Sequence, residues 1–340
     1  MIDHPIFFER NRVARVYTGG KLFADFFGDE AVDSHLPEEW VASSVRALNK
    51  ESAGPNEGIS KPVDSSLYFH ELLDSQKEVL LGKNRDEMGF LVKILDSAVR
   101  LPVQAHPDTA FSNVHFHSNY GKAESWIILA TRPDAKIYMG FKDSVTKDDF
   151  RAAIAASETD KTAMEGLLRE VAVKPGDVFF IPAKMVHAIG AGCLLLEVQE
   201  PTDFTIQPER YCADYRLSDY EMYLGLDPEV SLACFDFNAP VRGAQMPLLL
   251  QKAEGVLYEE LIGAKDTPCF NVNRMVFDGG KLPLLQGASV LVVTEGEGIL
   301  SSESTAKPVK KGDYFFLPDS VKGKFFLSGN LTVLECFKQN

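Results

Sequence analysis

The residues best suited to chemistry in this chain are two histidines, a glutamate and a glutamine. Gln104 and His106 lie two positions apart and come just before Pro107. Residues two apart in a strand point to the same face, so this amide and this imidazole project together. Glu124 and His187 supply a carboxylate and a second imidazole. The set predicts a site for Zn²⁺ or a similar first-row divalent ion with an open coordination position.

Three strand-like runs position these ligands. Residues 89–96 lead toward the first two ligands, and the proline that follows them stops strand pairing because it has no N–H to donate. Residues 125–130 are apolar without a break, as in a buried strand, and Glu124 opens them. Residues 178–182 form a third run after a Pro-Gly-Asp turn, and His187 lies just beyond it. We therefore expect the ligands at the ends of strands.

Simpler explanations remain open for each ligand. An acid at the edge of an apolar run needs a partner, because an unpaired buried carboxylate is costly. For Glu124 that partner is a metal, Lys122 or an arginine. A lone histidine in apolar surroundings, such as His187, is usually a hydrogen-bonded core residue. His115 and His117 form a His-x-His pair, but they lie in a polar segment, so we expect them in a cleft wall rather than among the ligands.

An internal repeat indicates the architecture. Residues 175–182 reappear as residues 311–318, and this register places Gly323 opposite His187. The residues from 256 to the end contain no histidine. We predict a mainly β fold of two jelly-roll barrels. Residues 1–240 would form the catalytic domain, and residues 241–340 a barrel without metal.

A small helical insertion is expected at about residues 146–171. Thr146 has the side chain of an N-cap. Helical spacing is seen in a later apolar set, formed by Met164, Leu167, Leu168 and Val171.

Length and composition restrict the class of protein. The chain has 340 residues, 45% hydrophobic and 25% charged, as in globular proteins. A net charge of −14 without a basic tract argues against binding to nucleic acid or to an anionic membrane. There is no run of apolar residues long enough for a membrane span and no visible signal peptide. Five widely spaced cysteines indicate reduced thiols, and we expect a cytoplasmic monomer or homodimer.

Three ordered motifs carry a family resemblance. They are Gln-x-His-Pro-Asp at 104–108, Gly-Lys-x-Glu-x-Trp at 121–126, and Ile-Pro-Ala-x-x-x-His-Ala-Ile-Gly-x-Gly at 181–192. Together they resemble type I mannose-6-phosphate isomerases of the short bacterial and archaeal form. The resemblance implies a zinc-dependent cupin enzyme with one ion per chain and a sugar phosphate as substrate. It would interconvert mannose 6-phosphate and fructose 6-phosphate through an enediolate.

The chain departs from the family pattern near the substrate. Gln207 ends a segment in which the family has Thr-x-Arg, and Pro102 stands where the family tends to have serine. The nearest arginine is Arg210, and we expect it and Lys122 to act in catalysis, with Arg210 reaching the metal cleft. The cationic groups available to meet a phosphate are Lys93, Lys122 and Arg210. The departures leave two alternatives, a metal cupin isomerase for another, unphosphorylated sugar and a sugar-binding cupin without turnover.

Overall fold

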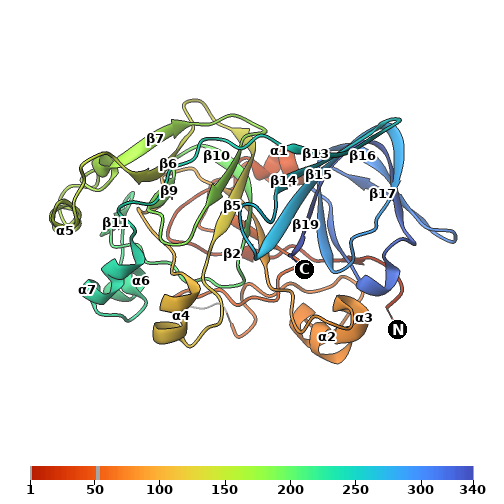
Figure 1. Cartoon of the computed structure of the whole chain (residues 1–340), viewed down its shortest axis with the longest axis horizontal. Coiled ribbons are helices and arrows are strands. Elements are labelled where there is room, and N and C mark those ends of the chain that lie inside the picture. The colour runs from red at the N-terminus through yellow and green to blue at the C-terminus, as the bar shows by residue number, and fades with distance from the viewer. Residues whose placement is uncertain (1, 51–53, 340) are drawn as a thin grey trace.

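Antiparallel strands form most of the chain. The computed structural model describes residues 2–50 and 54–339, and in these the strands make four sheets (Figure 1). The six-stranded sheet has the order β2-β3-β4-β10-β5-β8. Its strands are β2 Arg12–Val13, β3 Glu38–Val41, β4 Leu91–Asp96, β10 Cys193–Gln199, β5 Glu124–Thr131 and β8 Val178–Ile181.

Two small sheets accompany it. One has three strands in the order β7-β6-β9, and the other is a two-stranded hairpin. Their bounds are β7 Leu168–Ala172, β6 Lys136–Phe141 and β9 His187–Ile189, and β11 Tyr211–Cys212 and β12 Tyr215–Arg216.

The largest sheet has eight strands and contains most of the C-terminal third, coloured blue in Figure 1. It has the order β1-β18-β16-β19-β15-β14-β13, with β17 paired to β16. The N-terminal strand β1 thus pairs with the C-terminal part, and the domain division at residue 240 stays a prediction. The bounds are β1 Ile6–Phe7, β13 Leu248–Ala253, β14 Val256–Ile262, β15 Phe270–Pro283, β16 Ser289–Ser301, β17 Ala306–Lys310, β18 Tyr314–Leu317 and β19 Phe326–Lys338.

Helices are short and lie outside the sheets. None of those in the described residues is long and apolar enough to cross a membrane. They are α1 Phe23–Phe27, α2 Phe69–Ser75, α3 Lys77–Leu81, α4 Thr109–Phe116, α5 Lys147–Ala156, α6 Asp219–Tyr223 and α7 Pro228–Ser231, with 3₁₀ turns η1 Glu165–Leu167, η2 Leu232–Cys234 and η3 Asp319–Val321.

Burial of both faces of the six-stranded sheet explains the unbroken apolar runs in β4 and β10. Ile94 and Leu196 are cross-strand partners in the core shared with the eight-stranded sheet. Their neighbours Leu95 and Leu195 are also partners and pack on the opposite face, against the three-stranded sheet. Each such buried aliphatic side chain contributes roughly 1.5–3 kcal/mol to folding.

The sequence repeat corresponds to a repeated turn. Gly176 and Gly312 both have positive φ, 91° and 88°, which glycine adopts without steric cost. The aspartate after each glycine accepts a hydrogen bond from a backbone N–H three residues earlier, over 3.0 Å at Asp177 and 2.8 Å at Asp313. A strand follows each turn, β8 in the first copy and β18 in the second. The mainly β prediction is confirmed.

The helical insertion is only half helical. Thr146 caps α5 by accepting a hydrogen bond from Asp149 N, as predicted. The helical prediction for the second half is wrong, because Leu168–Ala172 form β7 and pair with β6. From Arg169 to Ala172 the exposure alternates with the two-residue period of a strand, and the four apolar residues fitted a helix pattern over too short a stretch to decide.

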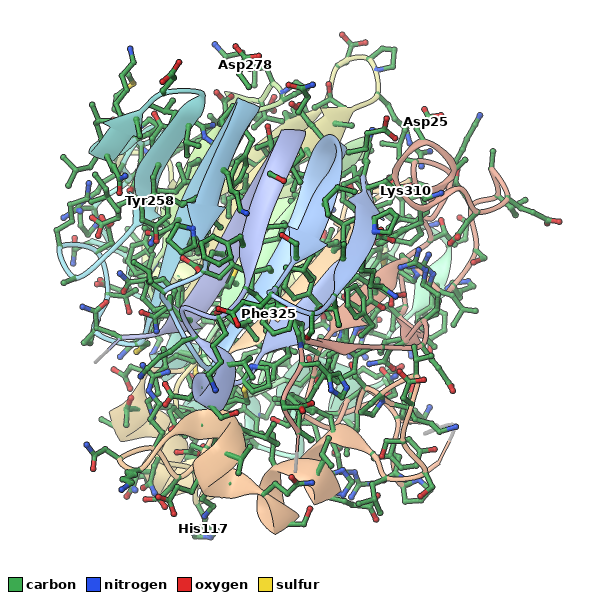
Figure 2. The ribbon with its side chains drawn as sticks, turned by 90° about the vertical axis from the view of Figure 1, so that its right-hand side faces the viewer. Asp25, His117, Tyr258, Asp278, Lys310 and Phe325 are labelled. Carbon is green, nitrogen blue, oxygen red and sulfur yellow. The ribbon has the colours of Figure 1, made fainter. Side chains whose placement is uncertain are left out.

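A carboxyl group is buried in the eight-stranded sheet. Glu335 on β19 accepts a hydrogen bond from the Tyr258 hydroxyl over 2.7 Å, and Tyr258 in turn accepts one from Asn273 Nδ2 over 2.7 Å. Tyr258 is labelled in Figure 2, which faces this sheet. Burial without a cationic partner raises the pKa of Glu335 to about 7.

Substitution of Glu335 should change how stability depends on pH. The unfolded carboxyl binds fewer protons than the folded one between its ordinary pKa of 4.5 and about 7, so stability falls across this window as pH rises. At pH 8 the raised pKa of Glu335 lowers the free energy of unfolding by about 3 kcal/mol. We therefore expect Glu335→Gln to gain stability relative to wild type from pH 4.5 to 8. Urea unfolding at several pH values measures this. Equal pH dependence in Glu335→Gln and in the exposed control Glu303→Gln would contradict it.

Candidate metal centre and pocket

Three of the predicted ligands converge. One ligand atom each from His106, Glu124 and His187 lie within 4.8 Å of one another, and all three side chains are buried. Glu124 is the first residue of β5 and His187 the first residue of β9, so both lie at strand ends as expected.

Backbone pairing brings the first ligand to the others. Gln104 and His187 form an antiparallel bridge, with N–H···O distances of 2.9 and 2.8 Å. On the other side, Ala105 bridges Ile206. The extended segment that leads to His106 is therefore held between β9 and the backbone at Ile206.

A glycine allows the remaining approach. Lys122 N donates to Pro107 O over 2.9 Å, which joins the segment of Glu124 to that of His106. A Cβ on Gly121 would lie 2.7 Å from the same carbonyl oxygen, closer than real Cβ contacts. Any larger residue at 121 would push these two ligand segments apart.

Both imidazoles are oriented by backbone carbonyls. Nδ1 of His106 lies 2.9 Å from Phe204 O, and Nδ1 of His187 lies 2.8 Å from Met185 O. A carbonyl oxygen only accepts, so Nδ1 carries the hydrogen and Nε2 keeps its lone pair. The two Nε2 atoms face Glu124, at 3.1 Å for His106 and 3.3 Å for His187.

This donor set fits a cation. Burial, aided by the charge of Lys122, lowers the pKa of His106 to about 3, and burial also lowers that of His187, so both rings are neutral. For Glu124, burial acts to raise the pKa, but the charge of Lys122 outweighs it and holds the pKa well below its usual value. His187 Nε2 makes no hydrogen bond. The lone pairs of the two Nε2 atoms repel the carboxylate that they face unless a positive charge lies between them. A divalent ion would supply that charge.

Two more of the predicted residues, Lys122 and Gln104, flank the centre. Lys122 Nζ lies 2.8 Å from His106 Nε2 and 3.0 Å from Glu124 Oε2. Gln104 lies opposite His187 through its backbone, and its side chain lines the adjacent pocket. Direct ligation by its amide oxygen stays a prediction.

One surrounding carboxylate holds the Glu124 segment. Glu200 accepts backbone hydrogen bonds from Gly121 over 3.2 Å and from Ala123 over 2.8 Å. Thr202 adds a hydroxyl bond of 2.7 Å to Gly121 O. The backbone that leads into Glu124 is thus fixed by the loop that follows β10.

A second carboxylate holds the His106 segment. Glu209 is fully buried, receives both terminal nitrogens of Arg100 over 2.8 and 2.7 Å, and accepts from Val103 N over 2.7 Å. The ion pair therefore fixes the strand that carries Gln104 and His106.

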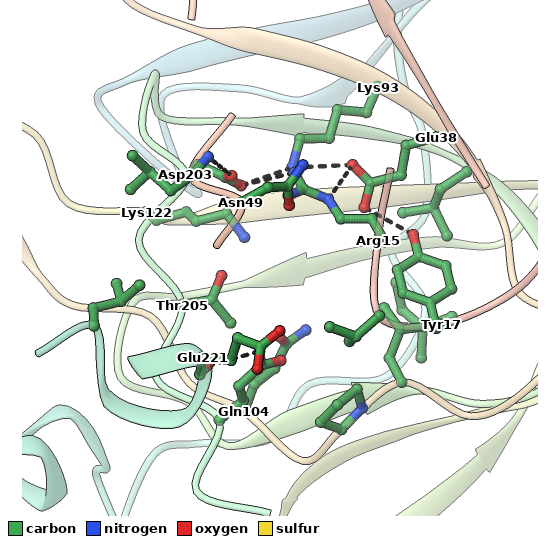
Figure 3. A pocket seen from close by; sticks show the side chains of 18 of the residues that line it. Arg15, Tyr17, Glu38, Asn49, Lys93, Gln104, Lys122, Asp203, Thr205 and Glu221 are labelled. Carbon is green, nitrogen blue, oxygen red and sulfur yellow. Dashed lines mark hydrogen bonds and ion pairs between the residues drawn. The ribbon is translucent and has the colours of Figure 1, made fainter. Parts of the chain in front are cut away.

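A pocket with a volume of about 110 Å³ adjoins the centre. Figure 3 shows Arg15, Glu38, Lys93 and Asp203 grouped on one side of it, and Gln104 and Glu221 on the other. Its lining consists of Arg15, Val16, Tyr17, Glu38, Leu48, Asn49, Lys50, Lys93, Leu95, Leu101, Pro102, Gln104, Lys122, Ile189, Glu197, Asp203, Thr205, Gln207, Tyr220, Glu221 and Leu224.

A charged cluster that we call the polar wall forms one side, and is made of Arg15, Glu38, Lys93, Glu197 and Asp203. Lys93 Nζ lies 3.4 Å from Glu197, 3.8 Å from Asp203 and 3.9 Å from Glu38. Burial and the charge of Glu124 raise the pKa of Glu197 to about 7. For Glu38, burial acts to raise the pKa, but Arg15 and Lys93 dominate and lower it to about 2.

The sequence analysis named only Lys93 from this wall, as one of several cationic groups. The sequence contains one feature that marks a second residue of the polar wall, Glu197. Lys93 and Glu197 are charged residues inside buried strands, and they are cross-strand partners between Trp40 and Trp126. Arg15 and Asp203 lie in irregular segments, and no local pattern marks them.

Arg210 does not lie where we expected. The described residues that line the pocket do not include it. Its Nε lies 2.6 Å from Glu158, its Nη1 lies 2.9 Å from Asp219, and the same nitrogen donates to Leu217 O over 2.9 Å. The guanidinium is held by these acids near α5 and α6, and Arg15 is the arginine that lines the pocket.

The His-x-His pair also lies elsewhere. His115 is in α4 and His117 is its C-cap residue, and neither belongs to the ligand cluster nor to the described lining of the pocket. Figure 2 shows His117 at the rim of the molecule.

Comparison with known proteins identifies the family. No family model matches the chain. It is 31% identical over 334 residues to the mannose-6-phosphate isomerase ManA of Bacillus subtilis (strain 168), which covers 97% of each chain. The chain belongs to the mannose-6-phosphate isomerase family. The solved mannose 6-phosphate isomerase from Bacillus subtilis matches with a TM-score of 0.77 at 25% identity, over 98% of this chain and 99% of that chain.

A more distant structure shares the fold. It is a mannose 6-phosphate isomerase bound with zinc and yttrium, and it matches with a TM-score of 0.71 at 16% identity, over 99% of this chain and all of that one.

Both departures from the family pattern fall in the pocket. Pro102 and Gln207 line it, and Gln207 Nε2 donates to Glu221 O over 2.9 Å. The two expected departures from the family pattern, a proline and a neutral amide, thus both lie in the pocket.

Removal of one imidazole should abolish metal binding. We expect His187→Ala to lower the affinity for a divalent ion at least about 100-fold, because it removes a neutral ligand from a three-ligand set. Metal per chain after dialysis, measured by atomic absorption, should fall close to zero. His115→Ala is the matched control and should keep the wild-type metal content. Full metal content in His187→Ala would contradict the assignment of the centre.

Removal of Arg210 should leave turnover nearly intact. Its guanidinium contacts surface acids, so we expect Arg210→Ala to change kcat less than about threefold and to lower the free energy of unfolding by about 1 kcal/mol. Steady-state kinetics and urea unfolding of one preparation measure both. A fall in kcat of two orders of magnitude with an unchanged fold would restore Arg210 as a catalytic residue.

Proposed function

We propose that this protein is a metal-dependent aldose–ketose isomerase that interconverts mannose 6-phosphate and fructose 6-phosphate. The observation that carries the proposal is the convergence of His106, Glu124 and His187 beside Lys122, which itself lines a pocket. Family membership and the family's names supply the reaction class and the substrate.

Zn²⁺ is the ion that we propose, held by His106, Glu124 and His187 with Gln104 as a fourth group. Two imidazoles and one carboxylate are a ligand set that zinc accepts, and a related isomerase structure is named as zinc-bound. The bound ion would act as a Lewis acid for the sugar oxygens.

Glu197 is the group best placed to move the proton. Aldose–ketose isomerisation takes a proton from C2 and returns one at C1. Glu197 lines the pocket, and its pKa of about 7 lets it accept and release a proton near neutral pH. Trp126 Nε1 donates to Glu197 Oε2 over 3.2 Å and fixes the carboxyl group.

Lys122 would stabilise charge rather than carry the proton. Its ammonium lies against the centre and has donors to offer a developing oxyanion. This keeps Lys122 in the catalytic role proposed from the sequence, with Glu197 added and Arg210 set aside.

A second candidate substrate has an observation in its favour. Pro102 and Gln207 give the pocket neither a hydroxyl nor a charge at two positions, which would suit an unphosphorylated sugar. The same assay with mannose separates the two substrates.

We further propose a cytoplasmic location and a monomer or homodimer.

An assay for fructose 6-phosphate formed from mannose 6-phosphate tests the function. We expect turnover with mannose 6-phosphate, a kcat that rises with pH as the carboxyl group of Glu197 loses its proton, and loss of activity after chelation. Glu197→Gln should reduce kcat by at least about 100-fold and remove the acid limb of the profile, with metal content unchanged. Wild-type protein that is metal-loaded but inactive on both sugars would overturn the proposal.

A further inference from the structure

Arg15 is the guanidinium that lines the pocket, and its contacts are those of a fixed group. Nη2 donates to Asp203 Oδ1 over 3.0 Å, Nη1 donates to Asn49 Oδ1 over 3.0 Å, and Nε lies 3.1 Å from Glu38 Oε2. The ring of Trp40 lies 5.2 Å away. A guanidinium has five N–H groups, and these three partners leave at least two of them free to donate.

The polar wall around Arg15 has no excess positive charge. Arg15 and Lys93 are set against the carboxyl groups of Glu38, Asp203 and Glu197. The cluster is neutral if Glu197 holds its proton and negative if it does not. A dianion gains little from cations that are already neutralised, because it would also face the carboxylates.

The same wall suits hydroxyl groups. A sugar hydroxyl both donates and accepts one hydrogen bond or more, and the wall presents fixed N–H donors beside carboxylate acceptors. Tyr17 and Trp40 donate to Glu38 over 2.8 and 2.7 Å, so the acceptor is held in place before substrate arrives.

A different cation lies at the pocket edge. Lys50 is exposed and makes no ion pair within residues 2–50 and 54–339. Its charge also acts on Glu221, another residue that lines the pocket. An anion held there keeps part of its hydration, which lowers the cost of binding a dianion.

We propose that Arg15 is a specificity-determining residue that binds hydroxyl oxygens of the sugar, and that the phosphate lies on the side of Lys50. The sugar hydroxyls then lie on the polar wall, and the phosphate lies at the exposed edge of the pocket. The identity of the substrate in this inference rests on the proposed function. The experiment that tests the inference does not, because it measures binding and not turnover.

Two probes separate the halves of the substrate. Mannose has the hydroxyls without the phosphate, and inorganic phosphate has the charge without the sugar. Calorimetric titration of the metal-loaded protein with each probe needs no turnover. Arg15→Gln should weaken mannose binding roughly tenfold and leave inorganic phosphate binding within twofold of wild type. Lys50→Gln should weaken inorganic phosphate binding about threefold and leave mannose binding unchanged.

Matched controls exclude general effects. Arg132 also lies between two carboxylates, at 2.7 Å from both Asp33 and Asp96, but outside the described lining of the pocket. Arg132→Gln should alter the binding of neither probe. Lys174→Gln is the matching control for Lys50→Gln, because it removes the charge of another exposed lysine. If Arg15→Gln weakens phosphate instead of mannose, or if neither variant alters its probe, the assignment is wrong. Absence of wild-type turnover with unchanged probe results would sink the proposed function alone.

Discussion

A buried carboxylate that faces two neutral imidazoles is the constraint on which this structure depends. The lone pairs of His106 and His187 point at Glu124, and no hydrogen bond satisfies His187 Nε2. Such an arrangement costs free energy in a protein interior unless a cation completes it. The fold supplies one cation in Lys122 and a ligand geometry for a second. The residues that can bind a divalent ion thus lower the stability of the folded protein at that place.

The loop that follows β10 holds much of this arrangement in place. The residues after β10 provide the carboxylate of Glu200 for the Glu124 segment, the carbonyl of Phe204 for His106 and the carboxylate of Asp203 for the polar wall. Glu197, at the end of the same strand, is the proposed proton carrier. Ligand orientation and proton transfer therefore share one backbone segment, so a shift of this loop would disturb both together.

The sequence predicted the part of the site that lies at strand ends and could not predict the rest. His106, Glu124 and His187 follow from strand phase and from three ordered motifs. Arg15 and Asp203 come from irregular segments far apart in the chain, and only tertiary packing joins them. Arg210 was favoured because it is near Gln207 in sequence, but a few residues are enough to turn a side chain toward α5. In the same way, tertiary pairing with β6 overrode the helical spacing around Leu168.

The polar wall also explains how a strongly acidic protein can accept an anionic substrate. With a formal charge of −14, the chain as a whole repels a sugar phosphate. Within the wall, Arg15 and Lys93 compensate two of the three carboxyl groups at distances between 3.0 and 3.9 Å, so the wall carries at most one negative net charge. At physiological salt, charges beyond roughly 8 Å are largely screened, and the local groups dominate. In the proposed holoenzyme, attraction for the anion would come from the divalent ion, Lys122 and Lys50, and hydroxyl geometry at the wall would decide which sugar is held.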